Sequence, residues 1–226
     1  MDVTDVKWEY IFNLEIAINN FGYVFSGIGY TLLISGMGFL FGLIWGFVLA
    51  LLRTSRFFFL NKLATLYISF MRGTPTLVLL FLLYFGFPFI GVYFDAVPAA
   101  ILGFSLSSSA YIAEIIRSAL EAIDKGQWEA GMSLGLPRGK VLRKIIVPQA
   151  LRIAVPPLSN VILDLVKSSA LAAMITVPDI FQNAKIVGGR ENDYMTMYIL
   201  VALIYWAICS LYEVLQGKLE KQFSSY

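Results

Sequence analysis

Charged side chains interrupt two apolar stretches of this sequence and could bind a charged solute. Arg72 lies within residues 57–87, and Asp164 and Lys167 lie within residues 148–177. A charged group in the bilayer core costs roughly 3 kcal/mol or more, so such residues are candidates for function. The Arg72 guanidinium could hold a carboxylate through two parallel hydrogen bonds. The Asp164 carboxylate could contact an ammonium group, so the pair matches a solute that carries both charges.

Polar neighbours extend both halves of this candidate site. The Thr74 hydroxyl could add a hydrogen bond beside Arg72, and Pro75 frees a backbone carbonyl nearby. On the other stretch, helical spacings of three and four place four polar side chains on one face: Asn160, Asp164, Lys167 and Ser168. Ser108, in the middle of a run of three serines, either lines the same pathway or only permits close helix packing.

Structural roles are the alternatives for each charged residue. Arg72 could pair with an acid on a neighbouring helix, and Lys167 could neutralise Asp164. Glu114 and Arg117 are three residues apart near the end of an apolar stretch, and we expect a structural ion pair there.

The composition favours a membrane protein over a soluble enzyme. The chain has 226 residues, of which 58% are hydrophobic and 14% are charged. Soluble domains average about a quarter charged residues, and a chain with 18 Phe and 12 Tyr is too apolar for a disordered coil. The absence of histidine and the single cysteine, Cys209, disfavour a zinc site and remove the usual general base. The expected role is therefore passage of a solute rather than its chemical transformation.

Apolar stretches predict an all-α integral membrane protein with one domain over residues 1–226. The five predicted spans cover residues 21–52, 57–87, 96–120, 148–177 and 194–212. Residues 1–20 are predicted to form an external segment, with a short interfacial helix over residues 8–18.

The distribution of basic residues predicts the orientation. With five spans and the N-terminus outside, 12 of the 17 Lys and Arg residues lie on the cytoplasmic side. Insertion favours such a cytoplasmic excess. The C-terminus is then cytoplasmic, and so is the segment over residues 126–146, which joins the third and fourth spans.

The segment over residues 126–146 reads as two short amphipathic helices around a turn. Gly135 suits the end of a helix and Pro137 prevents its easy continuation. A helix-turn-helix with exposed apolar residues is a natural docking site for another protein. An ordinary loop with interfacial helices explains the pattern equally well.

A resemblance to a known family favours the docking interpretation. Glu129-Ala130-Gly131, followed at fixed spacing by Gly135 and by residues 145–148, resembles the EAA loop of ABC importer membrane subunits. In that family the loop forms a coupling helix that contacts the ATP-binding subunit. Gly131 stands where the family commonly has alanine, and Val147 stands where it commonly has leucine.

Other segments extend the resemblance over nearly the whole chain. Residues 72–75, 109–114, 156–160 and 165–169 look like motifs of the polar amino acid permeases, whose members import histidine, glutamine, arginine or cystine. Residues 156–206 look most like the cystine-type members. Ser168 departs from many relatives, which have aspartate after the lysine. The resemblance implies import of a polar amino acid, with L-cystine as the best candidate and glutamine, arginine or histidine as alternatives.

The chain is predicted to need partners for energy. It lacks a G-x-x-x-x-G-K-[ST] phosphate loop, so we expect no enzyme activity and no cofactor in this chain. The resemblance implies a pair of ATP-binding subunits that hold ATP and Mg²⁺, a second permease subunit and an external substrate-binding protein. It places the assembly in the bacterial cytoplasmic (inner) membrane. A channel or an ion-coupled secondary transporter is the alternative class, although no filter-like loop or internal repeat favours either.

Overall fold

The computed structural model describes residues 11–224, with side chains through residue 218, and every regular element within them is helical. The elements, in chain order, are α1 (Leu14–Phe25), α2 (Ile28–Arg53), α3 (Phe58–Gly73), α4 (Thr76–Phe81), the π-helix η3 (Leu82–Gly86), the 3-10 helix η4 (Phe87–Ile90), α5 (Ala96–Glu121), α6 (Lys125–Ser133), α7 (Arg138–Val141), the π-helix η5 (Leu142–Ile146), α8 (Val147–Ser168), the 3-10 helix η6 (Ser169–Ile175), α9 (Ile180–Glu191) and α10 (Tyr194–Ser224). The predicted all-α class is confirmed for these residues.

Four straight helices of the described chain are long and apolar enough to cross a membrane. They cover Ile28–Arg53, Ala96–Glu121, Arg138–Ile175 and Tyr194–Lys218. A fifth span is obtained only if the bent pair Phe58–Gly73 and Thr76–Ile90 counts as one. The five predicted spans therefore correspond to four straight helices and one broken element.

The second predicted span is broken at Thr74 and Pro75. The helices on either side meet at an angle of 102°. Pro75 lacks a backbone N–H and disfavours a helical conformation of the residue before it, and Thr74 is accordingly extended (φ −100°, ψ 128°). The interruption predicted at residues 72–75 of the stretch over residues 57–87 is confirmed, and the structure adds the sharp change of direction. The break leaves Arg72 in the last turn of α3.

The N-terminal boundaries also differ from the prediction. The Asn13 side chain accepts a hydrogen bond from the Ile16 amide and starts α1, which continues through Phe25. The helix is interrupted at Ser26 and Gly27, so the first span begins at Ile28 rather than at Phe21. Residues 8–10 of the predicted interfacial helix lie outside the described residues.

The fourth span starts earlier than predicted. A separate amphipathic helix was expected over residues 138–146, but α7, η5, α8 and η6 form one candidate span of 38 residues from Arg138 to Ile175. Pro148 lacks a backbone N–H, and it comes directly after the π-helix η5, where the regular α-helical hydrogen-bond pattern is already interrupted. The chain remains helical from η5 into α8.

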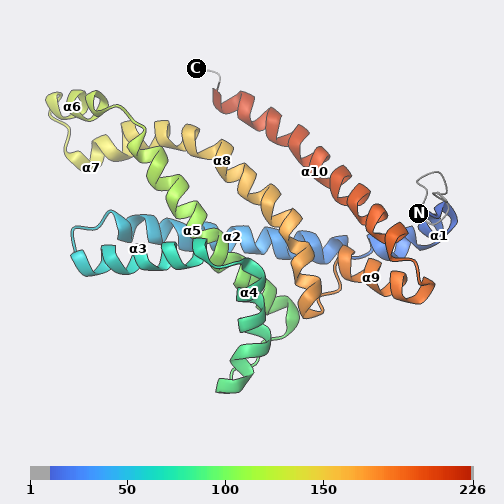
Figure 1. The fold of residues 1–226 in the computed structure, drawn as a ribbon. Coiled ribbons are helices and arrows are strands. Elements are labelled where there is room, and N and C mark those ends of the chain that lie inside the picture. Colours follow the sequence, from blue (N-terminus) through green and yellow to red (C-terminus); the bar gives the residue numbers. More distant parts are fainter. Residues whose placement is uncertain (1–10, 225–226) are drawn as a thin grey trace, which may run out of the picture.

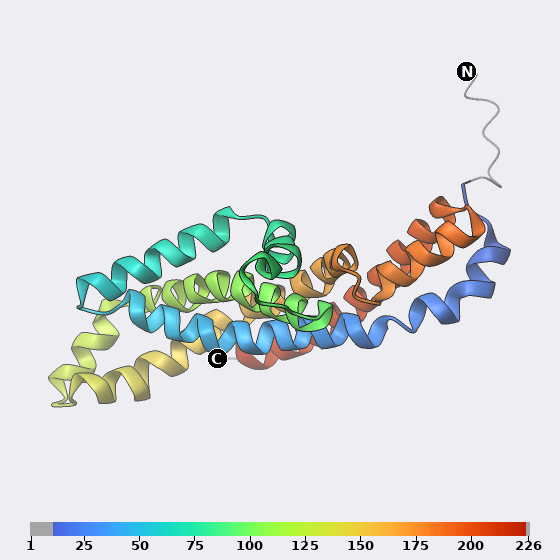
Figure 2. The same cartoon turned by 90° about the horizontal axis from the view of Figure 1, so that it is seen from below.

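The long helices place α6 and α1 at opposite ends of the molecule (Figure 1). The α6–α7 hairpin lies at the same end as the turn between α2 and α3, and α1 and α9 lie at the other end. Figure 2 shows α2 running along the middle of the helical body, with α3 beside it. The orientation across a membrane remains a prediction, and this arrangement is compatible with it.

Glycines at intervals of four residues let α2 pack closely against α5. Gly38, Gly42 and Gly46 are buried or half-buried, and a Cβ atom at each would contact α5. At Gly46 this atom would lie 2.8 Å from the Ser109 carbonyl oxygen. Small residues at these three positions therefore let the two helices approach closely.

Replacing Gly46 with alanine is expected to destabilise the chain by about 1–3 kcal/mol, because backbone atoms of α5 must move to admit the methyl group. Gly36→Ala is the matched control, since nothing lies within 4 Å of its added Cβ on the same helix. Thermal unfolding in detergent measures both variants. Equal melting temperatures would contradict the proposed close contact.

A buried carboxylate caps α9 in the segment between the last two candidate spans. Asp179 Oδ1 accepts a hydrogen bond from the Gln182 amide at 2.8 Å, while Oδ2 is buried without a hydrogen-bond partner among the described residues. Burial raises the pKa of Asp179 to about 7, against the opposing effects of the backbone hydrogen bonds and of Lys185. The protonated form is therefore favoured by folding.

Stability is expected to fall as the pH rises through about 7, because the folded chain binds the Asp179 proton more tightly than the unfolded chain. The stabilisation from the protonated Asp179 side chain is fully present below the pKa of aspartate in the unfolded chain, about 3.9. Asp179→Asn keeps a cap that cannot ionise, so its melting temperature should depend less on pH between 5 and 8. The same pH dependence in both proteins would show that another group is responsible.

Candidate functional site

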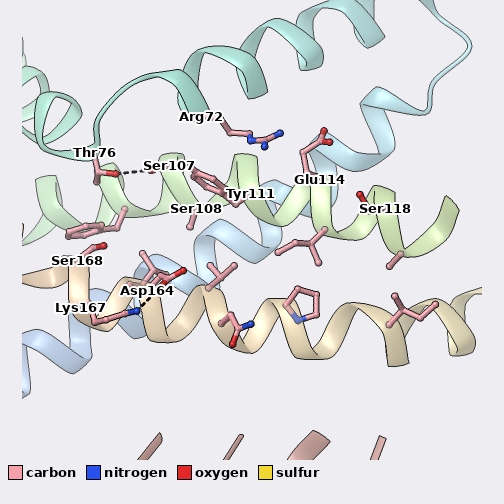
Figure 3. A pocket seen from close by; sticks show the side chains of 18 of the residues that line it. Arg72, Thr76, Ser107, Ser108, Tyr111, Glu114, Ser118, Asp164, Lys167 and Ser168 are labelled. Atoms are coloured by element: carbon pink, nitrogen blue, oxygen red, sulfur yellow. Dashed lines mark hydrogen bonds and ion pairs between the residues drawn. The ribbon is translucent and has the colours of Figure 1, made fainter. Parts of the chain in front are cut away.

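A cavity of about 1020 Å³ lies between α3, α5 and α8 (Figure 3). Of the seven predicted substrate residues, six line it: Arg72, Ser108, Asn160, Asp164, Lys167 and Ser168. The structure thus brings together side chains that are up to 96 positions apart in the sequence. Figure 3 shows Arg72 on one side of the cavity and Asp164 and Lys167 on the other.

Arg72 contacts an aromatic ring rather than an acid. Its guanidinium lies over the Tyr111 ring, 5.7 Å from the centroid. Within the described residues, no carboxylate oxygen lies within 4 Å of Arg72; the nearby Glu114 is bound instead by Arg53 and Arg117. The alternative prediction, an ion pair with an acid on a neighbouring helix, is not what this structure contains. The charge-assisted donors of Arg72 remain available to a ligand.

The opposite wall holds an exposed ion pair. Lys167 Nζ lies 2.9 Å from Asp164 Oδ1, and the two side chains are 54% and 71% exposed. Asn160 lies on the same face and accepts a hydrogen bond from Gln216 on α10 at 2.9 Å. Exposed pairs at this spacing contribute only about 0.3–0.5 kcal/mol, so stability alone is a weak reason for placing two charges here.

Two predicted hydroxyls differ from their expected positions. Thr74 does not line the cavity, because its extended backbone directs the hydroxyl back to α3, where it donates to the Phe70 carbonyl at 2.9 Å. Ser108 does line the cavity, but its hydroxyl donates to the carbonyls of Gly38 and Ser105 at 3.2 and 3.3 Å. The two interpretations of Ser108, pathway and packing, therefore both apply.

The sequence interpretation missed two residues that shape the cavity. Tyr111 supports the Arg72 guanidinium, and the Thr76 hydroxyl lies 3.2 Å from that of Ser107. Both lie within or next to segments that the resemblance had already marked. The signal for Tyr111 was its helical spacing of three from Glu114, which puts the two side chains on one face of α5.

An ion network surrounds Glu114, which lines the cavity. The predicted pair of Glu114 and Arg117 is confirmed, with Arg117 Nη2 3.0 Å from Glu114 Oε2. The network is larger than expected, because Arg53 at the end of α2 also contacts Glu114, and Arg117 Nη1 lies 2.5 Å from Glu121. It connects α2 to α5 near the hairpin of α6 and α7.

The predicted docking segment forms a tight helical hairpin. Asp124 accepts a hydrogen bond from the Gly126 amide at 2.6 Å and begins α6. Gly135 ends the turn in the left-handed region at φ 77°, which favours glycine. A Cβ at Gly131 would lie 2.9 Å from Val141 side-chain atoms, so glycine there lets α6 pack on α7.

The outer surface of this hairpin combines polar and apolar groups. Glu129 and Ala130 are exposed on α6, Met132 is 46% exposed and Leu134 is 80% exposed. Exposed apolar residues at the tip of a polar hairpin are typical of a protein contact.

Comparisons with known proteins agree with this architecture. The profile of the family described as "Binding-protein-dependent transport system inner membrane component" matches residues 38–225. The chain is 60% identical over 224 residues to the probable amino-acid ABC transporter permease protein YckA of Bacillus subtilis (strain 168), covering 99% of each chain. It is 40% identical over 202 residues to the L-cystine transport system permease protein TcyB of the same organism, covering 89% of this chain and 86% of the relative.

The structural comparison extends to a solved amino acid transporter. A structure described as "Crystal structure of an amino acid ABC transporter with histidines" has a TM-score of 0.87 at 32% identity, over 91% of this chain and 96% of that one. The family profile, the relatives and the fold agree on one assignment. The chain belongs to the family of binding-protein-dependent transport system inner membrane components, and its predicted relation to the amino-acid ABC permeases is confirmed.

Proposed function

We propose that this chain moves a polar amino acid across the cytoplasmic membrane as the permease subunit of an ATP-driven importer. Alternating access would pass the substrate from an external binding protein to the cytoplasm. ATP and Mg²⁺ would be held by a pair of partner ATP-binding subunits, and a second permease, identical or paralogous, would complete the pathway. The amino-acid permease names of the relatives support this proposal.

The observation that carries the proposal is the charge arrangement of the cavity. Arg72 offers a guanidinium that no carboxylate of the described residues pairs with, while Asp164 and Lys167 lie on the opposite wall. The carboxylate of an amino acid would bind the Arg72 guanidinium, and its ammonium group would contact Asp164. Lys167 would remain the counter-ion of Asp164. The volume, about 1020 Å³, is at the upper end of the range for small-ligand sites.

L-cystine is the proposed substrate. The relative named for L-cystine transport supports it at 40% identity, and cystine carries two carboxylates and two ammonium groups that a pair of cavities could share. The structure described with histidines keeps other polar amino acids as alternatives. Measuring ligand binding by the partner binding protein across the amino acids, followed by uptake with this permease, tests the choice. Uptake of glutamine, arginine or histidine but not cystine would overturn it.

We propose that the α6–α7 hairpin docks the ATP-binding subunit. Glu129, Ala130, Gly131 and Gly135 would be the coupling residues, as the EAA resemblance implies. Glu129, Ala130 and Gly135 are exposed at the end opposite α1, as is Leu134 at the tip, and this supports the role; Gly131 is buried and lets α6 pack on α7.

The double variant Asp164→Lys and Lys167→Asp, which exchanges the two charges, is expected to take up substrate about tenfold or more slowly than the wild type. The exchanged pair can still form, but the substrate ammonium group then meets a lysine at position 164. Uptake by proteoliposomes that contain the assembled transporter measures the effect, with Asp164→Asn as the single-site comparison. Recovery to wild-type uptake in the exchanged variant would show that the pair is only structural.

A further inference from the structure

A polar stripe runs along α3, the helix that carries Arg72. Lys62, Thr65, Ser69 and Arg72 are spaced by three, four and three residues, which places them on one helix face. The substrate cavity uses only the last of them. The remaining polar side chains on this mostly apolar helix call for another explanation.

The stripe borders a second cavity of about 420 Å³ between α3 and α5. Its lining comprises Arg53, Thr65, Ile68, Ser69, Arg72, Gly73, Tyr111 and Glu114. Arg72, Tyr111 and Glu114 line both cavities, so the stacked Arg72 and Tyr111 side chains lie where the two meet. A Cβ atom at Gly73 would meet nothing within 4 Å, which leaves the backbone open to a ligand.

The charge around this second cavity is positive. Arg53 interacts electrostatically with Arg72, Arg117 and Glu121, and it contacts Glu114. Three arginines against two glutamates leave one uncompensated positive charge in this group. Such a group favours an anion that accepts hydrogen bonds from guanidinium groups.

Hydroxyl donors complete the polar wall. The Ser69 side chain is exposed, and the described part of the chain gives its hydroxyl no hydrogen-bond partner. The Thr65 hydroxyl already donates to the Asn61 carbonyl at 2.8 Å. Ser69 is therefore the neutral donor that a bound anion could recruit.

Apolar side chains of the same helix lie beside the polar stripe. Leu63, Leu66 and Phe70 are 53%, 67% and 55% exposed. A ligand that joins an anionic group to hydrocarbon chains satisfies both surfaces. Basic pockets between membrane helices commonly bind lipid headgroups in this way.

We propose that the second cavity binds the phosphate of an anionic phospholipid, with Arg53, Arg72 and Ser69 as its donors. The acyl chains would cover Leu63, Leu66 and Phe70. Arg56, just before α3, and Lys62, near its start, are exposed and attract the negatively charged leaflet. Because Arg72 faces both cavities, the lipid phosphate would hold its guanidinium in place beside the substrate site. This inference is independent of which amino acid is transported.

Lipid retention by the assembled complex tests the proposal without transport. The complex is purified from nanodiscs of phosphatidylglycerol and phosphatidylcholine, and its bound lipids are counted by native mass spectrometry. Ser69→Leu fills the cavity and should reduce retained phosphatidylglycerol by about tenfold, the equivalent of one charge-assisted hydrogen bond. Ser69→Thr keeps the hydroxyl, and Leu60→Phe adds bulk on the same helix outside both the cavity lining and the proposed acyl-chain contacts, so both should retain the lipid.

Each outcome decides between lipid and other occupants. Selective retention of phosphatidylglycerol, lost in Ser69→Leu and unaffected by inorganic phosphate, supports the proposal. Equal retention of both lipids, equal retention by Ser69→Leu, or displacement by inorganic phosphate alone would overturn it. Since neither ATP nor an amino acid is present, failure here leaves the proposed transport function untouched.

Discussion

Replacing Arg72 with glutamine is expected to reduce amino acid uptake by the assembled transporter roughly 10- to 150-fold. The change removes the guanidinium that lies without a carboxylate partner in the cavity. Hydrogen bonds to charged groups contribute about 1.5–3 kcal/mol, and each 1.4 kcal/mol changes an equilibrium constant tenfold. Uptake by the Arg72→Lys variant should lie between that of the wild type and that of Arg72→Gln. Lysine keeps the positive charge but cannot form the two parallel hydrogen bonds of a guanidinium.

Substrate-stimulated ATP hydrolysis and uptake in proteoliposomes measure this effect. Arg56→Gln is the matched control, since it removes an exposed arginine in the turn before α3 that lines neither cavity. Unchanged uptake and unchanged apparent affinity in Arg72→Gln would refute the role of Arg72 in substrate binding.

Replacing Gly135 with valine should uncouple ATP hydrolysis from transport. A β-branched residue at φ 77° is strained by about 1–3 kcal/mol. The turn is held by hydrogen bonds from the Gly135 amide to Met132 and from the Leu136 amide to Gly131, at 2.9 and 3.3 Å. Losing this turn would reorient Leu134, and we expect the affinity for the ATP-binding subunit to fall at least about fivefold.

Co-purification of the ATP-binding subunit, together with ATP-driven uptake, measures the coupling. Gly139→Ala is the control, because it adds a methyl group into open space on α7 without a positive φ. Glu129→Ala tests the hairpin surface independently of its turn. Normal association and coupling in both Gly135→Val and Glu129→Ala, with normal membrane insertion, would contradict the docking role.

Much of the fold follows from local sequence features. Long apolar stretches predicted α2, α5 and α10, since a bilayer span needs about 20 apolar residues. Pro75 marked the interruption of the second span, but the angle of 102° depends on how α4 packs on the rest of the chain. The start of α2 depends on Gly27, whose added Cβ would lie 2.6 Å from the Asp179 carbonyl oxygen, a contact between distant segments.

The charged residues of the candidate site could be predicted from the sequence, because burying a charge in a membrane is costly. The direction of the uncharged side chains could be predicted less well, because it depends on the backbone conformation. Arg72, Asp164 and Lys167 stood out because apolar surroundings make ionised groups conspicuous. Thr74 was expected beside Arg72, but the extended backbone before Pro75 directs its hydroxyl away. The second partner of Glu114, Arg53, lies 61 positions away in the sequence, and only the packing of α2 on α5 brings it there.

Uptake of labelled L-cystine into proteoliposomes tests the central claim most directly. The vesicles contain this chain with its ATP-binding and permease partners, and the binding protein is added outside. We predict accumulation that requires both ATP at the ATP-binding subunits and the binding protein, and that Arg72→Gln reduces roughly 10- to 150-fold. Uptake that continues without ATP, driven by an ion gradient or by the cystine gradient alone, would contradict an ATP-driven importer.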